Sequence, residues 1–176
     1  NHAEGYLEDY LLVAKAEGLD ILGFSDHCPY PRDGLDTWAQ IRMSPEDAVK
    51  YSKDIKTIAK DKSIQIFSGF ECEWDFRYES WYKDFLFAEL EADYLVFGAH
   101  WVYDNGNFIY APEIQTKKQL FKYFDTIIEG LASGLFSFLA HPDLIMANGR
   151  PWDENLKAGF KAVIEASIQY KIPLEI

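Results

Sequence analysis

Short apolar runs alternate with amphipathic segments along almost the whole chain. Residues 6–17 carry apolar side chains at helical spacing and end before Gly18, and a compact apolar run then begins at Ile21. The same rhythm repeats downstream. It predicts helices over about 6–17, 45–60, 81–90, 117–131 and 153–170, and strands over 21–24, 64–68, 94–97, 136–139 and 172–176. Apolar strands alternating with such helices are typical of a parallel sheet buried on both faces.

Local signals refine this α/β pattern. Ser44 and Pro45 have the residue types of an N-cap and a first helical position. Asn105-Gly106 is a tight-turn signal. Five strand–helix units without a nucleotide-binding glycine motif favour a barrel over a doubly wound sheet. We find no linker, low-complexity run or internal repeat, so the pattern predicts one domain over residues 1–176.

Composition narrows the classes of function. The chain has 29 Asp and Glu against 17 Lys and Arg, a net charge of −12. This balance argues against nucleic-acid binding, which needs a basic surface. No apolar stretch approaches the roughly 18 residues of a membrane span, and no signal peptide opens the sequence. We therefore expect a cytoplasmic protein that binds no membrane, with Cys28 and Cys72 in structural roles rather than in a disulfide framework.

Candidate ligands for metal ions gather where the predicted strands end. His27, Glu71, His100 and His141 each lie at or just after the carboxyl end of a strand, and His2 precedes the first helix. In barrels, active sites are built on that face. Imidazole and carboxylate suit zinc, iron or manganese, and a carboxylate such as Glu71 can bridge two ions. A single histidine of this kind is more often a core or capping residue. The placement of all four histidines of the chain favours the metal site over that structural alternative.

Six short strings occur in an order that resembles a known family. They are HAEG, SDHCPYP, QIRM, GFECEW, GAHW and AHPDL, and they cover nearly the whole chain. Together they resemble the histidinol-phosphatase type of the PHP (polymerase and histidinol phosphatase) superfamily. The resemblance implies a distorted (β/α)7-type barrel that holds two or three divalent metal ions, zinc, iron or manganese.

The resemblance also implies roles for the candidate ligands. Glu71 would bridge two metal ions, His100 and His141 would complete one of those sites, and His2 and His27 would belong to a third site. The family also uses a His-x-His pair on its first strand and an Asp-x-His pair on a late strand, and this sequence has neither. We therefore expect the PHP domain to be truncated at both ends, without its first and last strands.

The implied activity is that of a metal-dependent phosphomonoesterase. Metal-activated water would hydrolyse L-histidinol phosphate to L-histidinol and phosphate in histidine biosynthesis, with Glu71, His100 and His141 as the catalytic centre. Two alternatives stay open. One is a PHP phosphatase for another phosphoester, such as a phosphotyrosyl protein or a nucleotide. The other is a metal-binding module without catalysis.

Further polar residues are candidates for supporting roles. Arg42 is the first candidate to bind the substrate phosphate, because a guanidinium binds phosphate bidentately, and Arg150 is the second. Asp26 and Asp143 adjoin ligand histidines, where they could orient an imidazole or make an ordinary turn contact. Glu73 shares a predicted strand face with Glu71, and lies either near the metal ions or in solvent.

Overall fold

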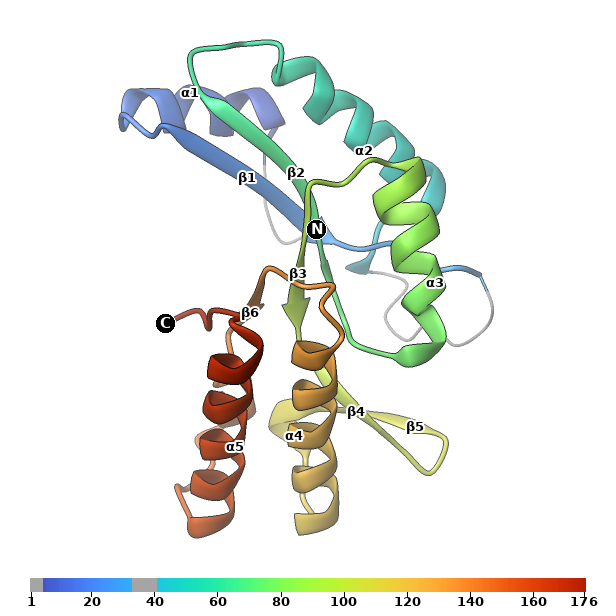
Figure 1. Ribbon diagram of the computed structural model, residues 1–176, viewed down its shortest axis with the longest axis vertical. Helices are drawn as coiled ribbons and strands as arrows, with labels where there is room; N and C mark the ends of the chain where they lie inside the picture. The colour runs from blue at the N-terminus through green and yellow to red at the C-terminus, as the bar shows by residue number, and fades with distance from the viewer. Residues whose placement is uncertain (1–4, 33–40) are drawn as a thin grey trace. The chain divides into compact units, whose positions relative to one another are not determined.

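The computed structural model describes residues 5–32 and 41–176, which divide into two compact units (Figure 1). Unit 1 contains the chain up to Glu71 together with Glu79–Leu95. Unit 2 contains Cys72–Tyr78 and Val96–Ile176. Among the described residues, no helix combines the length and the apolar character needed to cross a membrane.

Unit 1 is built on parallel strands. Its elements are α1 (Leu7–Ala16), β1 (Ile21–His27), α2 (Pro45–Ile58), β2 (Gln65–Cys72), α3 (Glu79–Trp81), the π-helix η3 (Tyr82–Glu89) and the start of β3 (Tyr94–Gly98). β1 and β2 pair in parallel from Ile21 opposite Gln65 to His27 opposite Glu71. On the other side of β2, the Asp93 N–H donates to the Ser68 carbonyl at 2.7 Å, which aligns the start of β3.

The helices of unit 1 follow the sequence signals closely. The Ser44 hydroxyl accepts a hydrogen bond from the Asp47 N–H (3.0 Å), which confirms the predicted N-cap of α2. The apolar face of α1 packs against the end of α2 and the start of β2. This small core consists of Leu11, Ala14, Ile58 and Ile64. The helical spacing of apolar residues over 6–17 predicts a helix with one buried face, and α1 buries that face.

The predicted helix over 81–90 differs from the observed one in its winding. Residues Tyr82–Glu89 form a π-helix, in which the Leu90 N–H donates to the carbonyl of Phe85, five residues earlier. Tyr82 is fully buried and its hydroxyl lies 3.2 Å from that of Tyr30. The residue pattern predicts the helix and its buried position but not its wider turn.

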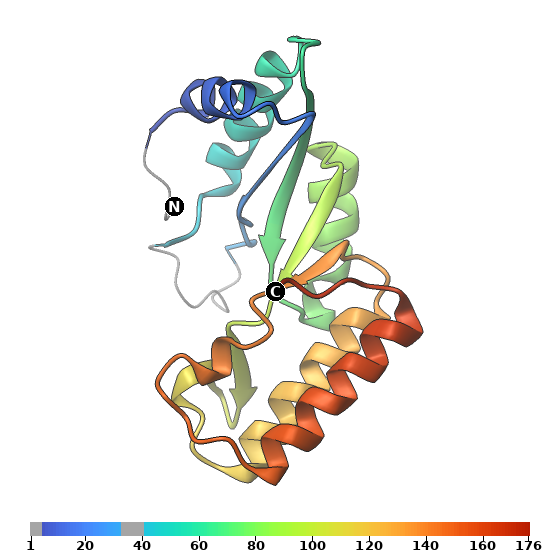
Figure 2. The same cartoon turned by 90° about the vertical axis from the view of Figure 1, so that its left-hand side faces the viewer.

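Unit 2 repeats the parallel arrangement. Its elements are η2 (Phe76–Tyr78), the end of β3, β4 (Trp101–Asp104), β5 (Asn107–Tyr110), η4 (Ala111–Glu113), α4 (Lys117–Ala132), β6 (Phe138–Ala140), η5 (Leu144–Met146) and α5 (Glu154–Tyr170). The end of β3 pairs in parallel with β6. The long helices α4 and α5 lie side by side (Figure 2). Parallel strands with helices between them confirm the α/β class.

Two parts of unit 2 differ from the predicted strands. The expected turn at Asn105-Gly106 is present, with positive φ angles of 50° and 85°, and it joins β4 and β5 into an antiparallel hairpin that the sequence pattern did not predict. The predicted strand over 172–176 is reduced to one parallel bridge between Leu174 and Leu139.

The helix ends of unit 2 are capped by side chains. Asp153 accepts a hydrogen bond from the Leu156 N–H at 2.8 Å, and this contact lowers the pKa of the Asp153 carboxyl. At the start of α4, Thr116 and Gln119 form a reciprocal capping box. These caps place both helix starts at the residues that the sequence predicts, within one position.

Candidate metal centre

In unit 1, parallel pairing brings a histidine and a glutamate together. His27 and Glu71 are register partners at the carboxyl ends of β1 and β2. His27 Nε2 lies 3.2 Å from Glu71 Oε2, and the two side chains are only 8% and 14% exposed. The register explains this proximity, because side chains at partner positions of neighbouring strands point to the same face of a sheet.

The His27 imidazole is held from its other side. Its Nδ1 lies 3.3 Å from the carbonyl oxygen of Ile41, a contact in which Nδ1–H donates. The contact leaves Nε2 on the side of Glu71, as the ring nitrogen that a metal ion shared with that carboxylate would bind. Asp26, a candidate for orienting the ring, makes a different contact: its carboxylate accepts from the backbone N–H of His27 at 2.8 Å.

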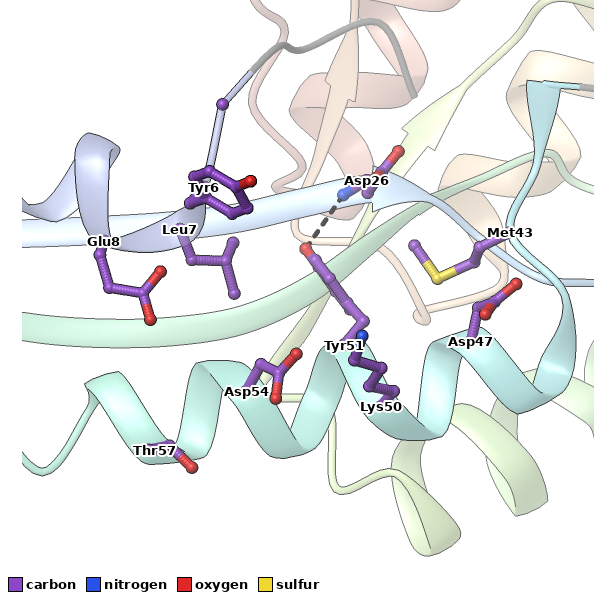
Figure 3. Close-up of a pocket in the computed structure, with 11 residues that line it drawn as sticks. Tyr6, Leu7, Glu8, Asp26, Met43, Asp47, Lys50, Tyr51, Asp54 and Thr57 are labelled. Atoms are coloured by element: carbon purple, nitrogen blue, oxygen red, sulfur yellow. Dashed lines mark hydrogen bonds between the residues drawn. The ribbon is translucent and has the colours of Figure 1, made fainter.

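Unit 1 has two neighbouring hollows, and the pair lines one of them. One, of about 550 Å³, is lined by His27 and Glu71 together with Asp26 and Tyr51. The other, of about 600 Å³, is also lined by Asp26 and Tyr51 and is shown in Figure 3. There the Tyr51 hydroxyl reaches from α2 and accepts from the Asp26 N–H at 3.2 Å. Burial raises the pKa of Tyr51, so its hydroxyl stays neutral.

The charges around the second hollow bear on what it can bind. Glu8, Asp26, Asp47 and Asp54 line it, against one basic side chain, Lys50 (Figure 3). Four carboxylates beside one ammonium group repel a phosphate. The lining of this second hollow is therefore unfavourable for a phosphate group.

In unit 2, two more candidate ligands lie next to each other. The ring centroids of His100 and His141 are 4.9 Å apart. Glu73 binds His100 twice: Oε2 accepts the backbone N–H at 3.0 Å, and Oε1 lies 2.5 Å from ring Nδ1. The hydroxyl of Tyr123 donates to the carbonyl of Ala99, which fixes the backbone just before His100. The sequence leaves Glu73 either near the metal ions or in solvent. It is only 4% exposed, so the prediction of a solvated side chain is wrong.

The backbone at His141 is strained. This residue has a φ of 30°, a backbone angle that residues other than glycine rarely adopt. Its N–H donates to Glu175 Oε2 at 2.8 Å, which helps to hold the conformation. Strain of this kind clusters at functional sites and costs on the order of 1–3 kcal/mol. Sequence reasoning missed Glu175, because nothing in a pattern signals a contact 34 residues away in the chain.

The candidate phosphate-binding arginines differ in environment. Arg42 is 8% exposed, and its guanidinium carbon lies 4.8 Å from the centre of the Tyr30 ring. Arg150 donates to the carbonyl oxygens of Ile114 and Ile145, which ties η4 to η5. Arg42 is therefore an anchored guanidinium in unit 1, whereas the observed bonds of Arg150 go to the backbone of unit 2.

Four other residues that the sequence singles out are His2, Asp143, Cys28 and Cys72. His2 lies outside the described residues. Asp143 precedes η5, and its carbonyl accepts from Met146 in the turn that follows His141. Cys28 and Cys72 are both buried as free thiols.

The donor set fits divalent metal ions. In each unit, nitrogen or oxygen donors of low exposure converge: His27 with Glu71 in unit 1, and His100 with His141 in unit 2. Neutral imidazole and carboxylate are ligands for zinc, iron and manganese. The hydrogen bonds to Nδ1 of His27 and of His100 are the outer contacts that metal-ligating histidines usually have.

Comparison with known proteins agrees with this chemistry. A family profile described as the PHP domain matches residues 1–176. A Deinococcus radiodurans protein named "Probable histidinol-phosphatase" is 29% identical over 150 residues, which cover 81% of this chain and 56% of that protein. The chain therefore spans little more than half the length of this curated relative.

Two solved structures share the fold. One is from Listeria monocytogenes, assigned as a histidinol phosphatase, HisK; it has a TM-score of 0.78 and 17% identity and covers 96% of this chain and 74% of its own. The other is a histidinol phosphate phosphatase of Lactococcus lactis in complex with zinc, L-histidinol and phosphate. It has a TM-score of 0.70 and 17% identity, over 99% of this chain and 68% of its own. At these identities the likeness establishes the fold.

Proposed function

This chain belongs to the PHP domain family, and we propose that it forms the catalytic part of a metal-dependent phosphomonoesterase that hydrolyses L-histidinol phosphate. The observation that carries the proposal is the pair of His27 Nε2 and Glu71 Oε2, 3.2 Å apart at the carboxyl ends of two parallel strands. These are the ligand types and the sheet edge at which metal-dependent hydrolysis is built.

The proposed ligands are His2, His27, Glu71, His100 and His141. Of these, Glu71 is suited to bridge two ions, because each carboxylate oxygen can bind one. His27 and His100 are held through Nδ1 and present Nε2. That all five residues serve a single cluster of two or three ions is a prediction from the sequence and the family.

The reaction needs an activated water and a neutralised phosphate. A bound divalent ion would lower the pKa of its water so that hydroxide is available at neutral pH, and its positive charge would neutralise the phosphoryl oxygens. Arg42 is proposed to add a bidentate contact to the phosphate. Its stacking on Tyr30 limits the side-chain entropy lost when it binds. Arg150 remains a second proposed phosphate ligand.

The proposed substrate rests on the relatives. The Deinococcus radiodurans protein is named for histidinol phosphate hydrolysis, and the Lactococcus lactis structure contains zinc, L-histidinol and phosphate. The net charge of −12 argues against nucleic acid as a substrate. We therefore propose a cytoplasmic enzyme that acts on a small phosphate ester.

Substrate preference tests this proposal. For the zinc-loaded full-length protein, we expect kcat/KM for L-histidinol phosphate to exceed that for phosphotyrosine and for a nucleoside monophosphate by about 100-fold or more, since a site built around one substrate discriminates by several kcal/mol. Release of inorganic phosphate measures all three reactions. A preference for phosphotyrosine or the nucleotide would contradict the substrate and keep the phosphatase class, whereas no phosphate release from any substrate would contradict the class.

A further inference from the structure

Glu73 is a buried carboxylate whose two oxygens both bind one residue. Oε2 accepts the backbone N–H of His100 at 3.0 Å, while Oε1 lies 2.5 Å from Nδ1 of the His100 ring. The Glu73 side chain is only 5% exposed and that of His100 is 14% exposed. The carboxylate therefore fixes both the main chain and the ring of His100 in a place with little competing water.

The chemistry of the two groups decides where the ring proton lies. An ionised carboxylate accepts hydrogen bonds and donates none. At 2.5 Å from Oε1, Nδ1 of a neutral His100 must carry the proton, and the lone pair is then on Nε2. Only a nitrogen with a lone pair can bind a metal ion.

We propose that Glu73 is a positioning residue that holds His100 as its Nδ1–H tautomer, with Nε2 as the ligand atom. The link to metal binding rests on the proposed function, whereas the tautomer itself does not. The hydrogen bond to the His100 backbone adds a second restraint, so the ring can neither flip nor move along the chain without losing a contact. The sequence suggests a shared strand face for Glu73 and Glu71, but it assigns Glu73 no partner.

The variant Glu73→Gln separates this role from packing. Gln has nearly the shape of Glu but offers one acceptor and one donor group. If its oxygen accepts the His100 N–H, its NH₂ faces Nδ1 and favours the Nε2–H tautomer, which cannot bind a metal through Nε2. If the amide turns over, its NH₂ meets the backbone N–H and one buried donor loses its partner, at about 1–3 kcal/mol.

The tautomer can be read directly by nuclear magnetic resonance. In metal-free, ¹⁵N-histidine-labelled protein at a pH where imidazoles are neutral, we expect Nδ1 of His100 to show the shift of a protonated nitrogen and Nε2 that of an unprotonated one. The His100 signals are assigned by their loss in His100→Gln. In Glu73→Gln we expect the Nε2–H form to become populated. A wild-type His100 in the Nε2–H form would overturn the proposal even if the variant did not fold.

Zinc affinity gives the second readout. In calorimetric titrations, Glu73→Gln is expected to bind zinc about 10–100-fold more weakly than the wild type, the usual loss when an outer contact of a metal-bound histidine is removed. Glu165→Gln is the matched control, because Glu165 is exposed on α5 and pairs with Lys161; we expect no change there. Unchanged zinc affinity in Glu73→Gln would contradict the link to metal binding. If the wild type bound zinc and lacked phosphatase activity, the proposed function would fail while the role of Glu73 stood.

Discussion

Replacing Glu71 with Gln is expected to lower kcat/KM for L-histidinol phosphate by about 1,000-fold or more. The carboxylate is the anionic member of the pair at the ends of β1 and β2, and Gln removes its charge and its capacity to bridge two ions. Metal ions contribute several kcal/mol of charge stabilisation in the transition state, and each 1.36 kcal/mol is a factor of ten in rate. Loss of the proposed bridging ligand should remove most of that contribution.

Steady-state kinetics with phosphate release, together with zinc content, checks this expectation. Gln matches Glu in volume and Glu71 is only partly buried, so the thermal midpoint of the metal-free variant should stay close to that of the wild type. Glu89→Gln, an exposed position in unit 1, serves as the control and should retain full activity. Glu71→Gln with activity within tenfold of the wild type would remove Glu71 from the catalytic centre.

Replacing Gly159 with Ala is expected to destabilise the protein by about 1–3 kcal/mol, although alanine is the better helix former. Gly159 lies buried in α5, and a Cβ there would come within 2.0 Å of Cδ2 and Cε2 of Phe124 in α4. Phe124 is 2% exposed and packs edge-on against Phe160, at 5.3 Å between ring centroids. The ring has little room to withdraw, so the two helices must separate or the ring must leave its rotamer.

The exposed neighbour of Gly159 provides the control. Ala158→Gly should cost only about 0.5–1 kcal/mol, the usual loss from glycine in a helix interior. Urea unfolding of the three proteins measures both changes. A Gly159→Ala variant as stable as the wild type, or more stable, would show that α4 and α5 do not pack as closely as described.

Much of the fold could be predicted from the sequence because its signals are local. Ser44 and Pro45 mark the start of α2, and the single apolar face of residues 6–17 identifies α1. The β4–β5 hairpin was missed although its turn was recognised, because its strands are only four residues each and lack clear alternation. The pattern predicts a helix over 81–90 but carries no signal for the π-helical winding of Tyr82–Glu89.

The sequence predicts where the candidate ligands lie along the strands, but not which residues hold them in place. The sequence predicts His27 and Glu71 at the carboxyl ends of strands, and the structure adds that they lie opposite each other in the register of β1 with β2. The contacts of Ile41 with His27 and of Glu175 with His141 join segments far apart in the chain. Glu73 follows the end of β2 at Cys72, where strand alternation no longer fixes side-chain direction. For these residues only the folded chain shows the partner.

We propose that this PHP domain supports metal-dependent phosphoester hydrolysis. The most direct test of this claim is a titration of metal-free full-length protein with zinc, iron(II) or manganese(II), in which bound metal and hydrolysis of L-histidinol phosphate are measured in the same samples. We predict activity at background without metal, a rise as the metal binds, and a plateau at two or three equivalents for at least one of the three ions. Full activity in the metal-free protein, or stoichiometric metal binding that brings no hydrolysis with any of the three ions, would contradict the claim.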